Sequence, residues 1–111
     1  MTAIFILAGC ATTPPPLEQL AVSKAAIVNA KSAGANELAP QEFKLANDKI
    51  IRADQAMEEK NFLLAQQLAE QAQLDAQLSI AVARSTKAKQ AADTVYDDSR
   101  VLQKEIIRNT R

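Results

Sequence analysis

The sequence predicts an all-α protein: a helical hairpin or three-helix bundle with a long, projecting, coiled-coil-like C-terminal helix. The composition is one reason, because alanine occurs 22 times and glutamine 10 times among 111 residues, with one tyrosine and no tryptophan. Alanine and glutamine favour helices, whereas strands are enriched in β-branched and aromatic residues. The second reason is spacing, since apolar residues recur at helical intervals from residue 17 onward. We therefore expect helices that pack closely through small side chains, within one helical domain over residues 17–111.

The first predicted helix begins at Leu17, because Pro16 suits the start of a helix. It ends near Gly34, which can form a C-terminal cap. A loop is expected from there to Ala39. The apolar face of this helix is predicted to consist of Leu17, Leu20, Ala21, Ile27 and Val28.

The second predicted helix begins at Pro40 and carries one apolar seam. Its apolar residues are spaced by three, four, three and four positions, as in a helix that packs along one side. Asp48 and Arg52 are expected to pair across one turn. Asn61 tolerates the left-handed conformation and is expected to close a tight turn to the next helix; one continuous helix through this point is the alternative. The seam consists of Phe43, Ala46, Ile50, Ala53 and Met57.

The third predicted helix runs from Phe62 to about Arg108, roughly 70 Å at 1.5 Å per residue. Its first half carries two apolar stripes, which suits a helix contacted on both sides in a bundle. The first stripe is Phe62, Ala65, Ala69, Ala72, Ala76 and Ala83. The second stripe is Leu64, Leu74, Leu78 and Ala81.

The second half of this helix keeps one stripe, and the first two helices are too short to cover its whole length. We expect residues 85–108 to project and to pair with another copy or with another envelope protein. The alternative is a solvated, partly frayed tail with chance periodicity. The stripe is Ala88, Ala92, Val95, Ser99, Leu102 and Ile106, of which all but Ser99 are the predicted partner interface.

The first ten residues contain an apolar run, 3–8, that is too short to span a bilayer and ends in small residues. The residues Leu7, Ala8, Gly9 and Cys10 that close it resemble the lipobox of bacterial lipoproteins. The resemblance implies a lipid on the Cys10 sulfur and removal of residues 1–9 as a signal peptide, with residues 10–16 as a proline-rich tether. Ala11, in place of aspartate, implies sorting to the outer membrane.

No Lys or Arg precedes Lys24, so we expect either an upstream start codon or a trimmed signal. The alternative to lipidation is a buried cysteine in a cytosolic protein.

The stretch from Ala39 through Arg84 resembles a helical domain of unknown function in outer-membrane lipoproteins of Gram-negative bacteria. In relatives this domain often precedes an OmpA-like module that binds peptidoglycan, but the chain ends at Arg111 without one, so that activity is not expected here. The segment also looks like half of a tetratricopeptide hairpin, although about three such repeats are needed for a stable solenoid. The residues that carry the first resemblance are Ala39, Pro40, Gln41, Glu42, Phe43, Ala46, Ala53, Ala56, Lys60, Asn61, Phe62, Ala65, Ala69, Ala72, Asp75 and Ala76.

The residues give little support for an enzyme, a metal site or a cofactor other than the covalent lipid on Cys10. There is no histidine, and Cys10 is the only cysteine. Adjacent carboxylates such as Glu58 and Glu59, or Asp97 and Asp98, do not face each other on a helix. Neither a glycine-rich phosphate loop nor a basic patch interleaved with aromatics is present, so we expect no small-molecule substrate and no nucleic acid.

These observations predict a lipoprotein on the periplasmic face of the outer membrane, with a structural or protein-interaction role in the cell envelope. Its partners would be the membrane, through Cys10, and an envelope protein or a second copy, through the C-terminal helix. The alternative is a small accessory subunit of an envelope transport or secretion complex that docks through its tetratricopeptide-like hairpin. Seven bases against four acids between Arg84 and Arg111 leave two interpretations: helix-dipole compensation, or an end that binds acidic envelope polymers.

Overall fold

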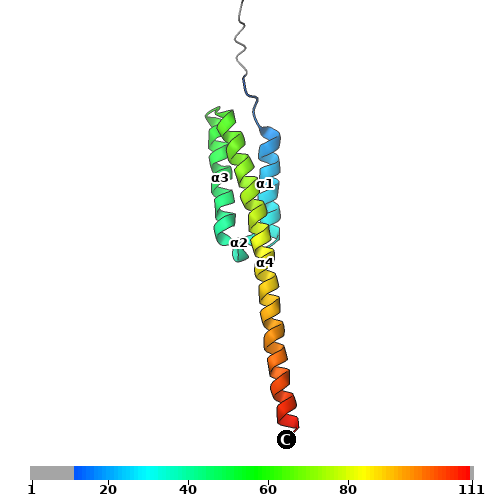
Figure 1. The fold of residues 1–111 in the computed structure, drawn as a ribbon. Coiled ribbons are helices and arrows are strands. Elements are labelled where there is room, and N and C mark those ends of the chain that lie inside the picture. The colour runs from blue at the N-terminus through cyan, green and yellow to red at the C-terminus, as the bar shows by residue number, and fades with distance from the viewer. Residues whose placement is uncertain (1–11, 111) are drawn as a thin grey trace, which may run out of the picture.

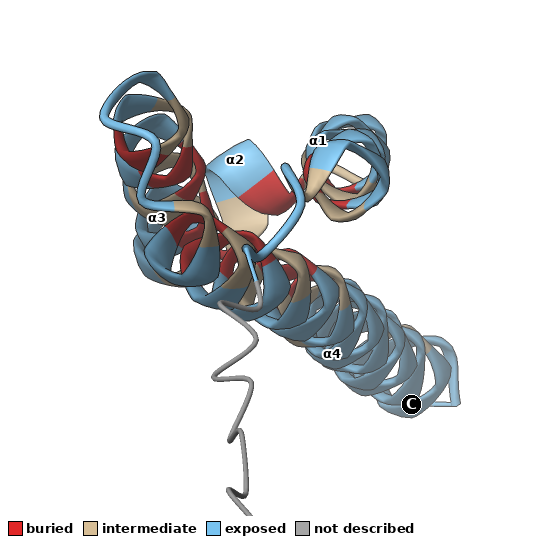
Figure 2. Ribbon diagram, turned by 90° about the horizontal axis from the view of Figure 1, so that it is seen from above, coloured by how far each residue is buried: buried red, intermediate tan, exposed pale blue. Residues whose placement is uncertain are grey.

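The computed structural model describes residues 12–110, which form four helices and no strand. Helix α1 spans Leu17–Ser32, α2 Ala35–Leu38, α3 Pro40–Glu58 and α4 Phe62–Asn109. Helix α3 runs antiparallel to α1 and α4, and α4 continues far beyond the other helices (Figure 1). Viewed from above, α1 and α3 both lie along one side of α4 (Figure 2). The predicted all-α class with a long projecting C-terminal helix is confirmed.

The connection between α1 and α3 differs from the predicted loop. Gly34 has a φ of +80°, which glycine adopts without steric cost, and this confirms the predicted end of α1. The expected loop is wrong, because α2 forms a single helical turn in its place. The Gly34 carbonyl accepts hydrogen bonds from the backbone of Glu37 and Leu38 at 3.1 and 3.0 Å. Ala35 and Ala39 are buried, so the turn also forms part of the core.

The turn between α3 and α4 separates two helices, so the alternative of one continuous helix is wrong. The residue in the left-handed conformation is Lys60, with a φ of +58°, and not Asn61 as predicted. Asn61 has another use at this turn. Its side-chain oxygen accepts a hydrogen bond from the Leu64 amide at 3.4 Å and so caps the start of α4.

The core is a line of small side chains between α4 and its two neighbours. The predicted seam of α3 is confirmed, since its three central residues are buried and Phe43 and Met57 are partly buried. On α4 the predicted alanine stripe is buried apart from Phe62, which is partly buried, and Ser79 fills the one gap in its spacing. We call these residues of α4 the inner seam. The inner seam consists of Ala65, Ala69, Ala72, Ala76, Ser79 and Ala83, all with no exposed area.

The predicted apolar face of α1 is partly wrong. Leu17, Ala21 and Val28 are exposed, whereas Leu20 is buried and Ile27 partly buried. The buried side instead includes Ser23, whose hydroxyl oxygen lies 2.7 Å from the backbone carbonyl oxygens of Gln19 and Ala69. A polar residue therefore occupies a core position of α1, because its hydroxyl finds a partner on α4. The buried or partly buried side of α1 is Gln19, Leu20, Ser23, Ala26, Ile27 and Ala30.

Two ion pairs that join helices are present, and one predicted pair is absent. Lys49 on α3 lies 2.6 Å from Asp75 on α4, and Lys24 on α1 lies 2.8 Å from Asp54 on α3. Asp48 was expected to pair with Arg52. It pairs instead with Lys44, one turn earlier, at 3.2 Å. Both pairs have the same spacing of four residues, which brings side chains together on a helix surface.

The second predicted stripe of α4 does not enter the core. Leu64, Leu74, Leu78 and Ala81 are exposed, with Leu74 64 % and Leu78 52 % exposed. The reason is geometric. Helices α1 and α3 share one broad face of α4 centred on the inner seam, so the opposite face has no neighbour among residues 12–110.

The inner seam predicts a strong dependence of stability on side-chain size. Replacing Ala72, which has no exposed area, with leucine inserts three carbon atoms into a closely packed interface. We expect the free energy of unfolding to fall by about 1–3 kcal/mol in urea denaturation. The matched control is Ala25→Leu at an exposed position of α1, which should change stability by less than about 0.5 kcal/mol. Equal effects of the two substitutions would contradict the proposed packing.

The left-handed backbone of Lys60 gives a second prediction. Glycine adopts this conformation without the clash of a Cβ atom, so Lys60→Gly should raise the free energy of unfolding by roughly 0.5–1 kcal/mol. The control is the neighbouring Glu59→Gly, because Glu59 has an ordinary right-handed φ of −76°. That substitution should lower stability or leave it unchanged. Thermal unfolding followed by circular dichroism would distinguish the two.

Candidate interaction surface

Helix α4 leaves the body of the molecule at Lys87. The Lys87 ammonium donates a hydrogen bond to the Ala33 carbonyl at the end of α1, at 3.0 Å. From residue 88 to residue 109, which we call the arm, every side chain is exposed except the partly buried Glu105. The arm is 22 residues long, or about 33 Å. We call the rest of the described helical structure, residues 17–87, the body.

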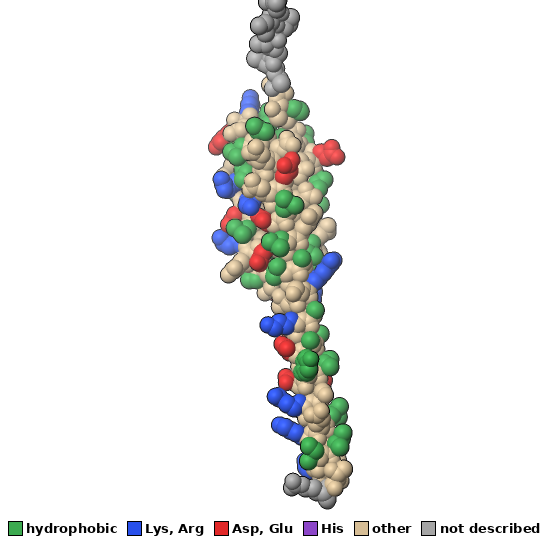
Figure 3. All heavy atoms as spheres, viewed as in Figure 1, with side chains coloured by type: hydrophobic (Ala, Val, Ile, Leu, Met, Phe, Trp, Pro, Cys, Tyr) green, Lys and Arg blue, Asp and Glu red, His purple; other side chains and the backbone are tan. Residues whose placement is uncertain are grey.

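The residues of the predicted partner interface lie on one side of the arm and are exposed. Val95 is 68 % exposed, and Leu102 and Ile106 are each 63 % exposed. Hydrophobic side chains gather along one side of the arm, and charged side chains lie mainly on the other (Figure 3). The arm therefore has an apolar side without a partner in the described chain.

This apolar side does not stop at the body. The exposed leucines of the body, Leu74 and Leu78, stand in the same alternating spacing of four and three residues as the stripe of the arm. One unbroken stripe therefore runs along α4 for 33 residues, or about 48 Å. We call it the outer seam. It consists of Leu74, Leu78, Ala81, Ser85, Ala88, Ala92, Val95, Ser99, Leu102 and Ile106, all exposed.

The sequence carried a signal for the outer seam that the prediction of two separate stripes missed. The spacing between Leu74 and Ile106 contains no interruption, so the body leucines and the arm stripe belong together. The inner seam ends differently. Continued in its own spacing beyond Ala83, it reaches six polar side chains before the apolar Ile107 near the end of α4, and these are Thr86, Gln90, Asp93, Asp97, Arg100 and Lys104.

The two seams lie on nearly opposite sides of α4. Successive residues of a helix are rotated by about 100°, which places Leu74 and Leu78 roughly opposite Ala72, Ala76 and Ala83. A helix with apolar residues on two sides is suited to partners on both. Helices α1 and α3 supply the partners of the inner seam, and no other described helix covers the outer seam.

The charged residues beside the outer seam are sorted along its length. Arg84 and Lys89 flank its half nearer the body, whereas Asp98 and Glu105 flank its distal half. Asp75 also borders the body end of the seam, but it is paired with Lys49 of α3 at 2.6 Å. Glu105 lies 2.8 Å from Arg108 in an exposed pair within the helix. Such surface pairs contribute little and can exchange partners.

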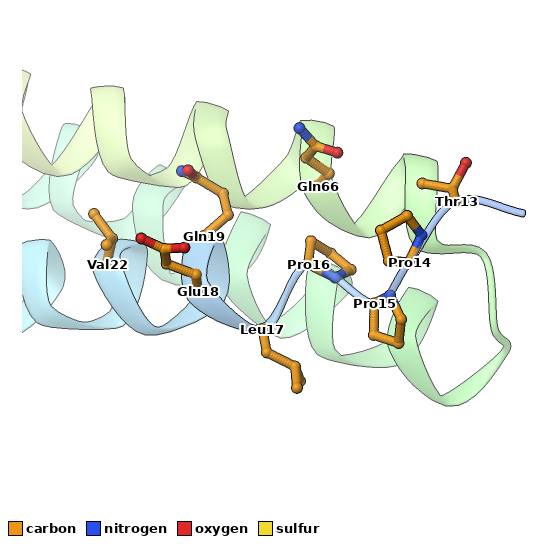
Figure 4. A pocket seen from close by; sticks show the side chains of 9 residues that line it. All are labelled: Thr13, Pro14, Pro15, Pro16, Leu17, Glu18, Gln19, Val22 and Gln66. Atoms are coloured by element: carbon orange, nitrogen blue, oxygen red, sulfur yellow. The ribbon is translucent and has the colours of Figure 1, made fainter. Parts of the chain in front are cut away.

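The remaining hollows of the surface are shallow and offer little chemistry. The proline-rich tether borders one of them beside the start of α1, where Gln66 of α4 stands near Pro16 and Leu17 points away (Figure 4). Glu18 is the only charged residue that lines it. A second hollow lies on the outer side of α3 and is bordered by Leu45 and Ile51 together with the charged residues Asp48, Lys49 and Arg52.

The groove of the α3–α4 hairpin, considered above as a docking surface, is filled by the chain itself. Leu20 and Ala30 of α1 belong to the same buried clusters as the alanines of α3 and α4. The tetratricopeptide-like residues therefore act in packing within the chain.

The described residues contain no group of three potential metal ligands, and none of their helices is long and apolar enough to cross a membrane. Asp97 lies 3.3 Å from Arg100 in an exposed pair. Nothing in this helical arrangement points to an enzymatic activity. The predicted lipobox, Leu7 through Cys10, and the sorting residue Ala11 lie outside the described residues.

Comparison with known proteins gives a family and a similar solved structure. Residues 18–95 match the family described as "Domain of unknown function (DUF4398)". A crystal structure of a DUF4398 family protein from Pseudomonas aeruginosa PAO1 is similar to this chain, with a TM-score of 0.73 and 36 % sequence identity. The match covers 84 % of this chain and 96 % of that one. A comparison with curated proteins gave no match. The chain belongs to the DUF4398 family, a family of helical domains whose function is unknown.

Proposed function

We propose that this protein is a lipoprotein anchored to the periplasmic face of the outer membrane through Cys10, with a structural or protein-interaction role in the cell envelope. The observation that carries this proposal is that the tether and the arm lie at opposite ends of the body. The tether leads to the end of the body that holds the α3–α4 turn, and the arm leaves from the opposite end (Figure 1). The described part of the tether and the arm therefore lie at opposite ends of the body.

The contacts of the tether support this arrangement. Thr12 and Thr13 border a shallow hollow together with Lys60, Asn61 and Phe62 at the α3–α4 turn. Cys10 precedes Thr12 by two residues, a reach of about 7 Å at most. A lipid on Cys10 would hold this turn near the membrane surface, while α4 extends about 72 Å from there over its 48 residues.

The surface of the protein supports binding of a macromolecule over binding of a small molecule. Small-molecule sites are concave and enclose most of the ligand's surface. The described hollows are open, whereas the outer seam is a long, convex apolar stripe of the kind that packs against another helix. The role therefore suits a rod-shaped connector in the envelope.

Acylation at Cys10 predicts a defined mature N-terminus. We would express the chain with a complete signal sequence in a Gram-negative host and examine the N-terminal peptide by mass spectrometry. The expected product starts at Cys10 and carries two or three acyl chains, because one chain alone holds a protein only marginally. The variant Cys10→Ser should keep its signal and leave the acylated membrane fraction. An unmodified wild-type peptide that still carries Met1 would overturn the proposal.

The residue after the cysteine predicts the membrane to which the protein is sorted. Ala11→Asp should move the acylated protein from the outer-membrane to the inner-membrane fraction in a sucrose gradient. Ala11→Ser is the matched control and should stay in the outer-membrane fraction. Retention of the Asp variant in the outer membrane would contradict the sorting role of this position.

A further inference from the structure

We propose that the outer seam is an antiparallel dimer interface, in which the arm of each copy lies along the back of the other copy's body. This inference rests on the proposed interaction role and names its partner as a second copy of this chain. It does not depend on the lipid. The length, the shape and the charges of the outer seam indicate that its partner is a second copy of this chain.

The outer seam is longer than a single local contact needs, and eight of its ten positions are apolar, with Ser85 and Ser99 as the exceptions. Ten positions keep the alternating spacing of four and three residues, which amounts to nearly five heptads. Apolar heptads sustained over three to four repeats indicate a coiled coil. The seam also crosses the boundary between arm and body at Ser85 and Ala88 without a shift. A partner that follows it must therefore contact both parts of α4.

The sizes of the side chains make the seam complementary to itself. Bulky residues occupy both ends, Leu74 and Leu78 on the body and Leu102 and Ile106 on the arm, whereas the middle is small. In an antiparallel pair that opposes Ala88 to Ala92, the two body leucines meet the two bulky residues of the arm. A twofold interface of this kind uses one surface patch on both subunits, so each contact occurs twice.

The flanking charges select the antiparallel orientation. In this register Arg84 of each copy faces Asp98 of the other, which gives two pairs of opposite charge. One contact of like charge remains, between the two Lys89 side chains at the twofold axis. A parallel pair would instead place Arg84 of each copy next to Lys89 of the other, which gives two contacts of like charge and none of opposite charge.

The arrangement agrees with an anchor on each copy. The two tethers would leave from the two ends of the paired rods. With the twofold axis normal to the membrane, both lipids could insert, and the pair would lie along the surface. Two anchors on one rod would also hold the dimer more firmly than one anchor holds a monomer.

The first test measures association of the full chain carrying Cys10→Ser, so that a failure of lipidation cannot affect the result. We expect concentration-dependent dimerisation in sedimentation velocity. The double variant Leu102→Glu/Ile106→Glu should raise the dimer dissociation constant by roughly a hundredfold, because four apolar contacts per dimer become buried charges. The matched control is Val101→Glu/Ile107→Glu, which changes arm residues of similar exposure, 59 % and 61 %, that lie off the seam.

A body variant distinguishes the proposed pairing from a contact between arms alone. Leu78→Glu changes an exposed residue, so the circular dichroism of the monomer should stay unchanged while dimerisation weakens at least tenfold. A chain that is monomeric at every concentration would overturn the proposal. So would a Leu78→Glu variant that dimerises like the parent, or an off-seam control that weakens the dimer as much as the seam variant.

The orientation is tested with two single-cysteine chains of different mass, Leu78→Cys and Leu102→Cys, each in the Cys10→Ser background. After mixing and mild oxidation, an antiparallel pair should give mainly the mixed disulfide between the two variants. Predominance of homodisulfides within each variant would show a parallel pair and overturn the proposed orientation.

Discussion

The structure depends on the close packing of helices against a line of small side chains on α4. Helices α1 and α3 both meet the inner seam, where five alanines and one serine have no exposed area. Small side chains allow the backbones to approach so closely that the Ser23 hydroxyl of α1 reaches the backbone carbonyl of Ala69 on α4. A larger residue at Ala69 or Ala72 would separate the helices and break this contact. The body is therefore stabilised by many small dispersion contacts and a few polar ones, and few large side chains are needed.

This packing determines where the open surface lies. Because α1 and α3 share one face of α4, the opposite face has no neighbour in the described part of the chain, although it carries Leu74 and Leu78. The same geometry explains the end of the body. Beyond Ala83 the inner spacing reaches Thr86, Gln90 and Asp93, which form no apolar contact surface for a further helix. The arm is helical to Asn109 even so, which suits its alanine-rich first half and the lack of any proline or glycine.

Much of the fold could be predicted from the sequence, because helix ends and seams follow local rules. Pro16, Gly34 and Pro40 mark helix boundaries at the expected places, and the seam of α3 follows its spacing of three and four residues. The predictions that were wrong concern which residues face another helix and which residue closes a turn. A serine in the core, such as Ser23, cannot be distinguished from a surface serine until its acceptor on another helix is known. Likewise, Lys60 and Asn61 are neighbours at one turn, and local preference alone assigned the left-handed conformation to the wrong one.

The surface of α4 shows why the candidate site was only half predicted. The apolar residues of the arm were recognised because no other helix could cover them, but the leucines of the body were assigned to the bundle because leucine usually lies inside. The spacing distinguishes the two possibilities, because Leu74 and Leu78 share the heptad phase of the arm stripe and not the phase of the inner seam. A helix in a three-helix body needs one broad apolar face, so a second apolar stripe on the opposite face is available to a partner outside that body. The inner spacing reaches only polar residues from Thr86 to Lys104, whereas the outer seam keeps its phase across the end of the body. This difference between the two seams supports the proposal that the outer seam packs against a second copy.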